Sequence, residues 1–410
     1  MSTPDRPDLR VAMIGHAFMG TAHSQAWRTV NRVFDLPLRA RMVAVCGRDA
    51  DRTKAAASRL GWDEAVTDWR ALVERDDIDL IDICTPGDSH AEIAVAALAA
   101  GKHVLCEKPL ANTVAEARLM ATAAADARAR GVRAMCGFNY RRVPGVVLMR
   151  QLVDAGRIGT VRHVRAVYLQ DWLGDPQFPL TWRLRRERAG SGALGDVGSH
   201  IVDLAQYVTG QSVTGVSALT ETFVRRRPLA SRSSGLAAVA AAGAPQFGDV
   251  TVDDAALFTA RMSGGAVASF EATRFATGRK NGLRIEVNGE LGSVAFDLER
   301  LNEIEFYDAT GPGTEQGFTR ILVTEPEHPY LTAWWPPGHL IGYEHSFTHE
   351  MRDLIDAVAT GTDPRPSFED GLRVQLVLDA VQQSANAGSA WTAVESPSTS
   401  NARSNYVHRM

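Results

Sequence analysis

Residues 11–20 read VAMIGHAFMG, an apolar run that passes directly into a turn with the pattern G-x-A-x-x-G. The near-continuous apolar residues predict a strand that is buried on both faces. Gly15 and Gly20 permit a tight turn, and a helix starting near Thr21 would direct free backbone N–H groups toward a bound phosphate. Ala17 adds one methyl group where such a pattern usually has glycine. The stretch therefore predicts the first βαβ unit of a dinucleotide-binding domain.

The same alternation continues to about residue 139. Alanine-rich helical stretches separate four further apolar runs, which read MVAVCG, IDLIDICTP, HVLCE and VRAMCGF. Strands alternating with helices predict an α/β domain with a doubly wound parallel sheet, the Rossmann arrangement, over residues 1–139.

Beyond Tyr140 the pattern changes to period-two alternation, as in VRHVRAVYLQ and AVASFEATRF. This alternation predicts an α+β domain over residues 140–394 with a large, mostly antiparallel sheet. We expect this domain to bind the substrate and to support oligomerisation. The Ala-, Gly-, Ser- and Arg-rich segment at about 225–249 is expected to be an inserted long loop, and residues 395–410 a disordered tail.

Composition excludes several classes of partner. The chain has 410 residues, with 44 Lys and Arg against 48 Asp and Glu, so it has no overall basic field for nucleic acid. Its N-terminus is polar and no window approaches ~20 apolar residues, so we expect a cytoplasmic protein that does not bind membranes. The four cysteines each close an apolar run and none stands at C-x-x-C spacing, which argues against a metal site or a disulfide.

The cofactor is expected where the parallel strands end. The residues expected to contact it are Gly15, His16, Ala17, Phe18, Met19, Gly20, Arg48, Thr85, Pro86, His90, Glu107 and Lys108. The second strand ends in CGRD (46–49), with glycine where an NAD enzyme often carries an acid. Arg48 favours tolerance of the 2′-phosphate of NADP, whereas Asp49 would still reach a ribose, so NAD and NADP both stay open.

Two of these cofactor-side positions have alternative interpretations. His90 either stacks against the nicotinamide or ribose, or is a surface group at a helix start. Lys108, between Glu107 and a proline that ends the fifth strand, is restrained there, and its ammonium suits an oxygen on which negative charge develops. We expect a cis bond before Pro109 to aim this lysine.

A second candidate group lies in GALGDVGSH (192–200), a glycine-rich approach to a helix. If it is helical, Asp196 and His200 lie four residues apart on one face. An aspartate that is hydrogen-bonded to an imidazole fixes its tautomer and raises its basicity, as a general base acting on an alcohol requires. A metal-binding pair and a purely structural pair are the alternatives.

Together these residues resemble the Gfo/Idh/MocA family of sugar and inositol oxidoreductases. The resemblance covers nearly the whole chain and rests on GHAFMG (15–20), CTPGDSH (84–90), EKP (107–109), GFNYRR (137–142) and GALGDVGSHIVDL (192–204). It implies that Lys108, Asp196 and His200 are catalytic and surround the reacting carbinol. It also implies NAD or NADP as cofactor, a small sugar or cyclitol as substrate, and a homodimer or homotetramer.

Within the family, the motif pattern is most similar to levoglucosan dehydrogenase-like enzymes, which oxidise the C3 hydroxyl of a pyranose ring. The residues that this resemblance assigns to the sugar pocket are Asn139, Tyr140, Gln170, Trp172, Arg183 and Tyr343. The expected function is oxidation of a ring hydroxyl of a sugar, anhydrosugar or glycoside to the ketone. The alternatives are a myo-inositol 2-dehydrogenase, and an NAD-dependent glycoside hydrolase or lyase that oxidises the ring transiently. A cofactor-sensing protein without catalysis is disfavoured because all three catalytic residues are present.

Overall fold

The computed structural model describes residues 6–232, 239–240 and 246–397. Its N-terminal half is a parallel six-stranded sheet in the order β3-β2-β1-β4-β5-β6, so the predicted Rossmann arrangement is confirmed. The strands are β1 Asp8–Ile14, β2 Arg39–Cys46, β3 Glu64–Val66, β4 Leu80–Ile83, β5 His103–Glu107 and β6 Ala134–Gly137. The helices are α1 Phe18–Val33, α2 Ala50–Leu60, α3 Trp69–Glu74, α4 His90–Ala99 and α5 Val114–Arg128.

The second half is built on a nine-stranded sheet in the order β18-β17-β16-β15-β7-β14-β13-β8-β19. Its strands are β7 Val161–Leu169, β8 Val213–Glu221, β13 Ala255–Met262, β14 Val267–Thr273, β15 Gly282–Gly289, β16 Gly292–Asp297, β17 Glu303–Asp308, β18 Thr319–Leu322 and β19 Thr392–Ala393. All neighbours pair antiparallel except β7 and β14, as the period-two alternation predicts. The helices of this half are α6 Pro144–Asp154, α7 Arg186–Ala189, α8 Ser199–Thr209, α9 Tyr343–Thr360 and α10 Phe368–Asn386.

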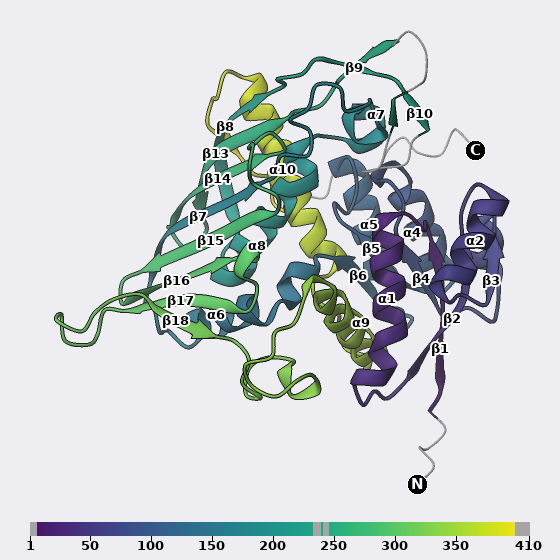
Figure 1. Cartoon of the computed structure of the whole chain (residues 1–410), viewed down its shortest axis with the longest axis horizontal. Helices are drawn as coiled ribbons and strands as arrows, with labels where there is room; N and C mark the ends of the chain where they lie inside the picture. The colour runs from purple at the N-terminus through teal and green to yellow at the C-terminus, as the bar shows by residue number, and fades with distance from the viewer. Residues whose placement is uncertain (1–5, 233–238, 241–245, 398–410) are drawn as a thin grey trace.

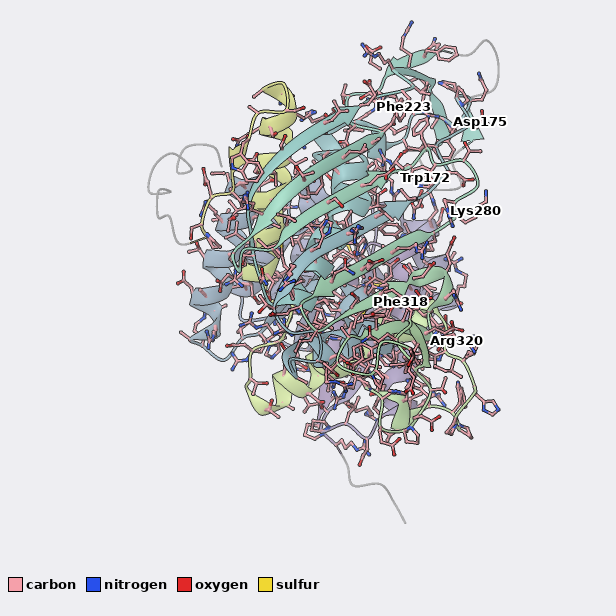
Figure 2. The ribbon with its side chains drawn as sticks, turned by 90° about the vertical axis from the view of Figure 1, so that its left-hand side faces the viewer. Trp172, Asp175, Phe223, Lys280, Phe318 and Arg320 are labelled. Carbon is pink, nitrogen blue, oxygen red and sulfur yellow. The ribbon has the colours of Figure 1, made fainter. Side chains whose placement is uncertain are left out.

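One face of this sheet packs on helices and the other is open. Figure 2 shows the open face turned toward the viewer, with the side chains of its strands projecting outward. Along β13, burial alternates so that Leu257, Thr259 and Arg261 are exposed while their neighbours are buried. The open face is therefore the solvent side of an amphipathic sheet.

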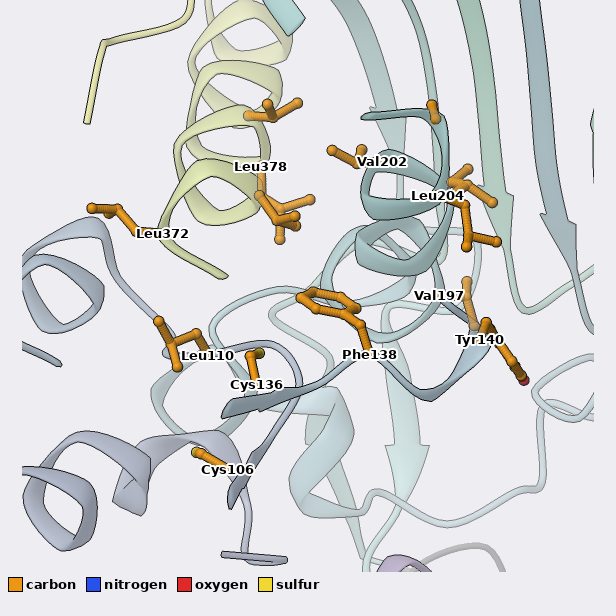
Figure 3. Packing of buried hydrophobic residues seen from close by; sticks show 14 of the residues in the cluster. Cys106, Leu110, Cys136, Phe138, Tyr140, Val197, Val202, Leu204, Leu372 and Leu378 are labelled. Carbon is orange, nitrogen blue, oxygen red and sulfur yellow. The ribbon is translucent and has the colours of Figure 1, made fainter. Parts of the chain in front are cut away.

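The two halves share their core and the chain crosses between them three times, near residue 140, before α9 and again before β19. Figure 3 shows Phe138, just after β6, packed near α8 and α10, so the apolar cluster runs from the first half into the second. Helix α9 then returns to the first half and lies beside α1 (Figure 1). Its residues Phe347, Met351 and Leu354 belong to the same buried cluster as Trp27 on α1. The boundary near residue 140 stays a prediction, but it does not separate two independent cores.

The segment at about 225–249 is not an unstructured loop where it is described. It forms β9 Arg226–Pro228, β10 Ala230–Arg232, β11 Val239–Ala240 and β12 Phe247–Asp249, with β9 pairing β12 and β10 pairing β11. The fully buried Arg227 holds it down by donating to the carbonyls of Leu173, Asp175 and Phe178. The composition of the segment does not predict these strands, because they are stabilised by contacts with residues 171–180, far away in sequence.

Of the predicted tail, residues 398–410 lie outside the described part of the chain. Within the described ranges, no helix is both long and apolar enough to cross a membrane.

Candidate active site

A cleft of about 2230 Å³ lies where the carboxyl ends of the parallel strands face the second sheet. Ligand pockets typically measure ~300–1,000 Å³, so this volume exceeds what a small substrate alone needs. Every residue assigned above to the cofactor or the sugar lines this cleft, with the exception of Gly20. The structure therefore brings the two predicted groups, from two halves of the chain, to one place.

The turn after β1 is shaped by two glycines. Gly15 has a φ of +99°, and a Cβ there would lie 2.6 Å from the carbonyl oxygen of Cys84. A Cβ on Gly20 would lie 2.2 Å from the carbonyl oxygen of Gly15, so Gly20 acts beneath the turn rather than in the cleft. Helix α1 begins at Phe18 and directs its first N–H groups over this turn. The turn fits the pyrophosphate of a dinucleotide, and Ala17 is accommodated there as an exposed residue.

The His90 side chain is buried and links two loops. It is 1% exposed, its Nε2 lies 2.9 Å from the carbonyl oxygen of Thr85, and its Nδ1 lies 3.1 Å from that of Pro109. The alternative of a surface group is therefore wrong, because the ring joins two loops that carry cofactor-side residues. Contact with the nicotinamide or ribose stays a prediction.

Lys108 projects from the end of β5 toward the second half, and the bond before Pro109 is cis as expected. Its Nζ donates to the backbone carbonyl of Asp196 at 2.8 Å and lies 3.8 Å from the Asp196 carboxylate. Its backbone N–H donates to the carboxylate of Glu107 at 3.0 Å. The lysine is therefore held at both ends.

A buried polar chain lies behind this lysine. Nε2 of His23 lies 2.9 Å from Glu107, and its Nδ1 lies 3.0 Å from Asp82, which also accepts from the indole N–H of Trp27. Burial lowers the pKa of His23, but Asp82 outweighs burial and holds this pKa well above its usual range. His23, Asp82 and Cys84 are spaced to hold a metal ion, yet both His23 nitrogens are already paired with carboxylates. This chain instead fixes Glu107 and, through it, the backbone of Lys108.

Asp196 lies among cations. Its carboxylate faces Lys108 on one side, and Arg274, fully buried at the end of β14, lies 3.3 Å away on the other. Burial raises the pKa of Asp196, but Lys108, Arg274 and Arg183 outweigh burial and leave this pKa below its usual value. Asp196 is therefore a carboxylate at neutral pH.

His200 is a neutral imidazole. It is buried, its ring centroid lies 4.6 Å from that of Tyr140, and its Nδ1 has no hydrogen-bond partner. Burial and the nearby Lys108 hold its pKa well below the usual range. An imidazole that stays unprotonated and has a free nitrogen is able to accept a proton.

The predicted hydrogen bond between Asp196 and His200 is absent from the structure. Residues Leu194–Gly198 form a π turn before α8 begins at Ser199. A π turn contains more residues than an α turn, so a spacing of four no longer places two side chains one above the other. Asp196 turns to Lys108 and Arg274 instead, and His200 packs against aromatic rings.

Three of the six predicted sugar-pocket residues, Tyr140, Gln170 and Trp172, take part in a chain of hydrogen bonds. The Tyr140 and Tyr168 hydroxyls lie 2.8 Å apart, and Tyr168 donates to Asn281 at 2.7 Å. Gln170 also donates to Asn281, and its own oxygen accepts from the indole of Trp172 at 3.0 Å. These groups give the cleft a polar wall interleaved with rings, which suits a ligand with many hydroxyls.

The remaining three predicted residues border this wall. Asn139 donates to Ser346 at 2.9 Å, and the Tyr343 ring lies 6.2 Å from that of Tyr140. The Arg183 guanidinium lies over the Trp182 ring, and burial lowers its pKa. All three line the cleft.

Sequence reasoning missed Tyr168, Arg274 and Asn281. Tyr168 lies on β7 two residues before Gln170, which directly follows the strand, so period-two alternation places both on one side and is a usable signal. Arg274 directly follows β14 and Asn281 directly precedes β15, and nothing in their sequence context distinguishes them.

Comparison with known proteins decides the family. Residues 9–138 match the model of the oxidoreductase family with an NAD-binding Rossmann fold, and residues 146–295 match the GFO/IDH/MocA C-terminal domain. The chain belongs to the Gfo/Idh/MocA family. It is therefore an oxidoreductase in which residues 9–138 form an NAD-binding domain.

Several members of the Gfo/Idh/MocA family resemble the chain along nearly its whole length. Levoglucosan dehydrogenase of Pseudarthrobacter phenanthrenivorans is 40% identical over 392 residues, which is 94% of this chain and 98% of that protein. A crystal structure of an oxidoreductase domain protein from Kribbella flavida is 59% identical with a TM-score of 0.90, covering 95% and 100% of the two chains. Levoglucosan dehydrogenase in complex with NADH and levoglucosan is 38% identical with a TM-score of 0.88, covering 95% and 99%.

Proposed function

We propose that the protein is an NAD(P)-dependent dehydrogenase that oxidises a ring hydroxyl of a levoglucosan-like sugar, with C3 favoured, to the ketone. One observation carries this proposal: Lys108 from the first half and Asp196 and His200 from the second line one cleft together. The similarity to levoglucosan dehydrogenase supports the choice of sugar. The assignment of the catalytic residues is part of the proposal.

Two residues of the chain handle the hydroxyl group: one removes its proton and the other stabilises the charge left on its oxygen. When bound, the nicotinamide supplies the acceptor for the hydride that leaves the ring carbon. His200 is neutral and lines the cleft, so its ring takes the hydroxyl proton. Lys108 keeps its ammonium near the reacting oxygen and stabilises the negative charge that develops there. Loss of a hydride and a proton converts the alcohol to a ketone.

Asp196 has a different role from the one expected in the sequence. Because it contacts Lys108 and Arg274 rather than His200, it holds the ammonium in place and balances the two cations. The polar wall of Tyr140, Gln170 and Asn281 offers donors and acceptors for the other ring hydroxyls, and Trp172 covers an apolar ring face.

Two further features belong to the proposal. The open face of the nine-stranded sheet supports a homodimer or homotetramer, because exposed Leu219, Leu257 and Val267 lie on its strands. The four cysteines are free and buried, which supports a reducing, cytoplasmic location.

A substrate panel tests the function. Levoglucosan, myo-inositol, glucose and a glucoside are each incubated with NAD and with NADP, and absorbance in the reduced-nicotinamide band is followed. We expect net reduced cofactor with levoglucosan. Faster reduction with myo-inositol would favour a cyclitol dehydrogenase, and a cleaved product without net reduction would favour a hydrolase or lyase.

A further inference from the structure

The cleft continues past the polar sugar wall into an apolar part. The residues that line it there belong neither to the predicted cofactor set nor to the predicted sugar set, and they include Phe178, Leu180, Trp182 and Leu229. Phe178, Trp182 and Leu229 are only half-buried, so each leaves apolar surface uncovered in the cleft. Uncovered apolar side chains inside a cleft are typical of a ligand site.

Trp172 joins this apolar part to the proposed catalytic group. Its indole N–H donates to Gln170 of the sugar wall, and the centroid of its ring lies 5.3 Å from that of Phe178. The Cζ atom of Arg274, whose guanidinium contacts Asp196, lies 5.5 Å from the same ring. One tryptophan therefore borders both the sugar wall and the apolar part, so a single ligand can extend from one into the other.

The apolar part is fixed by two segments that lie far apart in sequence. Leu180 and Leu229 form a parallel backbone bridge, and the N–H of Leu180 donates to the carbonyl of Pro228 at 2.7 Å. A Cβ on Gly248 would lie 2.6 Å from Cδ2 of Leu180 and 3.0 Å from Cδ2 of Leu229, so glycine at this position leaves room for both leucines. The wall is therefore formed in advance of binding, which lowers the cost of ordering it around a ligand.

A free monosaccharide does not match both parts of the cleft. Its hydroxyls suit the polar wall, but it has no apolar group that would cover Phe178, Trp182 and Leu229. A glycoside has both parts, since its aglycone extends from the anomeric carbon of the sugar. An aryl aglycone in addition offers a flat ring to the two aromatic side chains.

We propose that Phe178, Trp182 and Leu229 form a subsite for the apolar aglycone of a glycoside, so that the sugar ring to be oxidised is the glycosyl part of an aryl glycoside. The ring hydroxyls face the polar wall, and the aglycone lies beyond Trp172. The subsite rests on the proposed dehydrogenase function and specifies its substrate class.

Steady-state oxidation of matched glycosides by the full chain tests the subsite. Phenyl and methyl D-glucopyranoside, each as both anomers, are compared with levoglucosan while reduction of the cofactor is followed. We expect kcat/KM for the better phenyl anomer to exceed that of the matching methyl glucoside at least about tenfold. The gain should appear mainly in KM, because the aglycone is buried equally in the ground state and the transition state.

Two variants shorten the apolar wall, Leu229→Ala and Trp182→Ala. In each, the ratio of the phenyl to the methyl kcat/KM should fall at least about fivefold. Leu229→Met keeps an apolar side chain of similar volume and should keep the ratio. Calorimetric titration with the dinucleotide shows that each variant is folded. The control is Leu119→Ala, which removes an exposed leucine of α5 outside the cleft and should leave the ratio unchanged.

Two results would overturn the subsite and leave the dehydrogenase proposal intact. The first is oxidation of levoglucosan with a phenyl glucoside that is no better than the methyl glucoside. The second is an unchanged ratio in both Leu229→Ala and Trp182→Ala. If none of the sugars reduces the cofactor, the proposed function itself fails.

Discussion

Arg274 is a fully buried arginine whose guanidinium faces the Asp196 carboxylate at 3.3 Å and also donates to the carbonyl of Asp253. Its replacement by methionine keeps much of the side-chain volume and removes the charge. Asp196 would then lose one of the cations that keep its pKa low, and its hold on Lys108 would weaken. We expect kcat to fall about ten- to a hundredfold, with the acid limb of the pH–rate profile shifted to higher pH.

Arg274→Lys provides the matched control, since it retains a cation at the same position. It should restore the acid limb even if it recovers only part of kcat. An unchanged profile in Arg274→Met would show that Arg274 supports the fold and not the charge of Asp196.

Glu350 is a second buried group, and it has no hydrogen-bond partner on either carboxylate oxygen. Burial raises its pKa from 4.5 to about 8, Glu107 adds to the shift, and His23 and Arg142 oppose it. Between these two pKa values the folded chain holds one more proton than the unfolded chain. The contribution to stability is therefore complete below about pH 4.5 and is lost as the pH rises through about 8.

Glu350→Gln removes this titration and keeps the shape. We expect the variant to match the wild type in Tm near pH 4.5 and to exceed it near pH 9, because between about pH 4.5 and 8 the unfolded wild type gives up the proton that the folded form keeps. Differential scanning calorimetry at both pH values measures this difference, with the exposed Glu74→Gln as control. A Tm difference that does not change with pH would contradict the account.

The type of a single residue predicts a functional role only where a recognisable motif surrounds that residue. Lys108 stood between a strand and a proline, and the structure places it in the cleft. Arg274 follows a strand in the run EATRF, where a solvated arginine looks the same. Its burial follows from the contact with Asp196, 78 residues away in sequence, which no local pattern contains.

The π turn that carries Asp196 and leads into α8, the helix of His200, is held by one carboxylate. Asp253 accepts the N–H groups of Gly192 and Leu194, both at 2.7 Å, and a Cβ on Gly192 would lie 1.7 Å from the Asp253 carbonyl oxygen. Because asparagine has one acceptor oxygen, Asp253→Asn leaves one buried N–H facing an amide donor. We expect a loss of about 1–3 kcal/mol in the free energy of unfolding.

The same variant should lower kcat while the affinity for the dinucleotide stays within about twofold, because the turn does not form the cofactor end of the cleft. Urea unfolding measures the change in stability, cofactor reduction with levoglucosan measures kcat, and calorimetric titration measures the dinucleotide affinity. Asp249→Asn, an exposed substitution, is the control. Equal kcat in Asp253→Asn and the wild type would show that the turn does not position the proposed catalytic pair.

Elements with a strong periodic pattern could be predicted, and elements shaped by tertiary contacts could not. The strands of the first half are buried and apolar, so their existence and parallel order follow from pattern. The π turn at Leu194–Gly198 is different, since Gly195, Asp196 and Gly198 suit an α-helix start as well. Asp253, which fixes it, comes from a distant part of the chain.

Across the whole molecule, the nine-stranded sheet has one face without a helical cover in the described part of the chain (Figure 2). We expect a dimer or tetramer formed through this face. Introducing charges with L219D/L257D should shift the assembly toward the monomer, because both leucines are exposed on adjacent strands. Sedimentation velocity measures the state. A wild type that is monomeric at micromolar concentration would contradict the expectation.

The switch to period-two hydrophobic alternation near residue 140 predicts two parts of different architecture. It does not predict that these parts share one core. Helix α9 packs on α1 although more than 300 residues separate their sequences. Phe138 joins both parts of one core (Figure 3). Such contacts follow from chain topology, which a local pattern does not contain. They place Lys108 opposite the π turn of Asp196 and the start of α8, where His200 lies.

The proposed oxidation depends on the ammonium of Lys108, so removal of this side chain is the most direct test. Lys108→Ala and the surface control Lys54→Ala are compared for NADH and NADPH binding by calorimetry and for turnover of levoglucosan by cofactor reduction. We predict that Lys108→Ala binds the dinucleotide that the wild type binds, within about threefold, and loses turnover by at least about a thousandfold. A Lys108→Ala variant with near wild-type kcat would contradict the central claim.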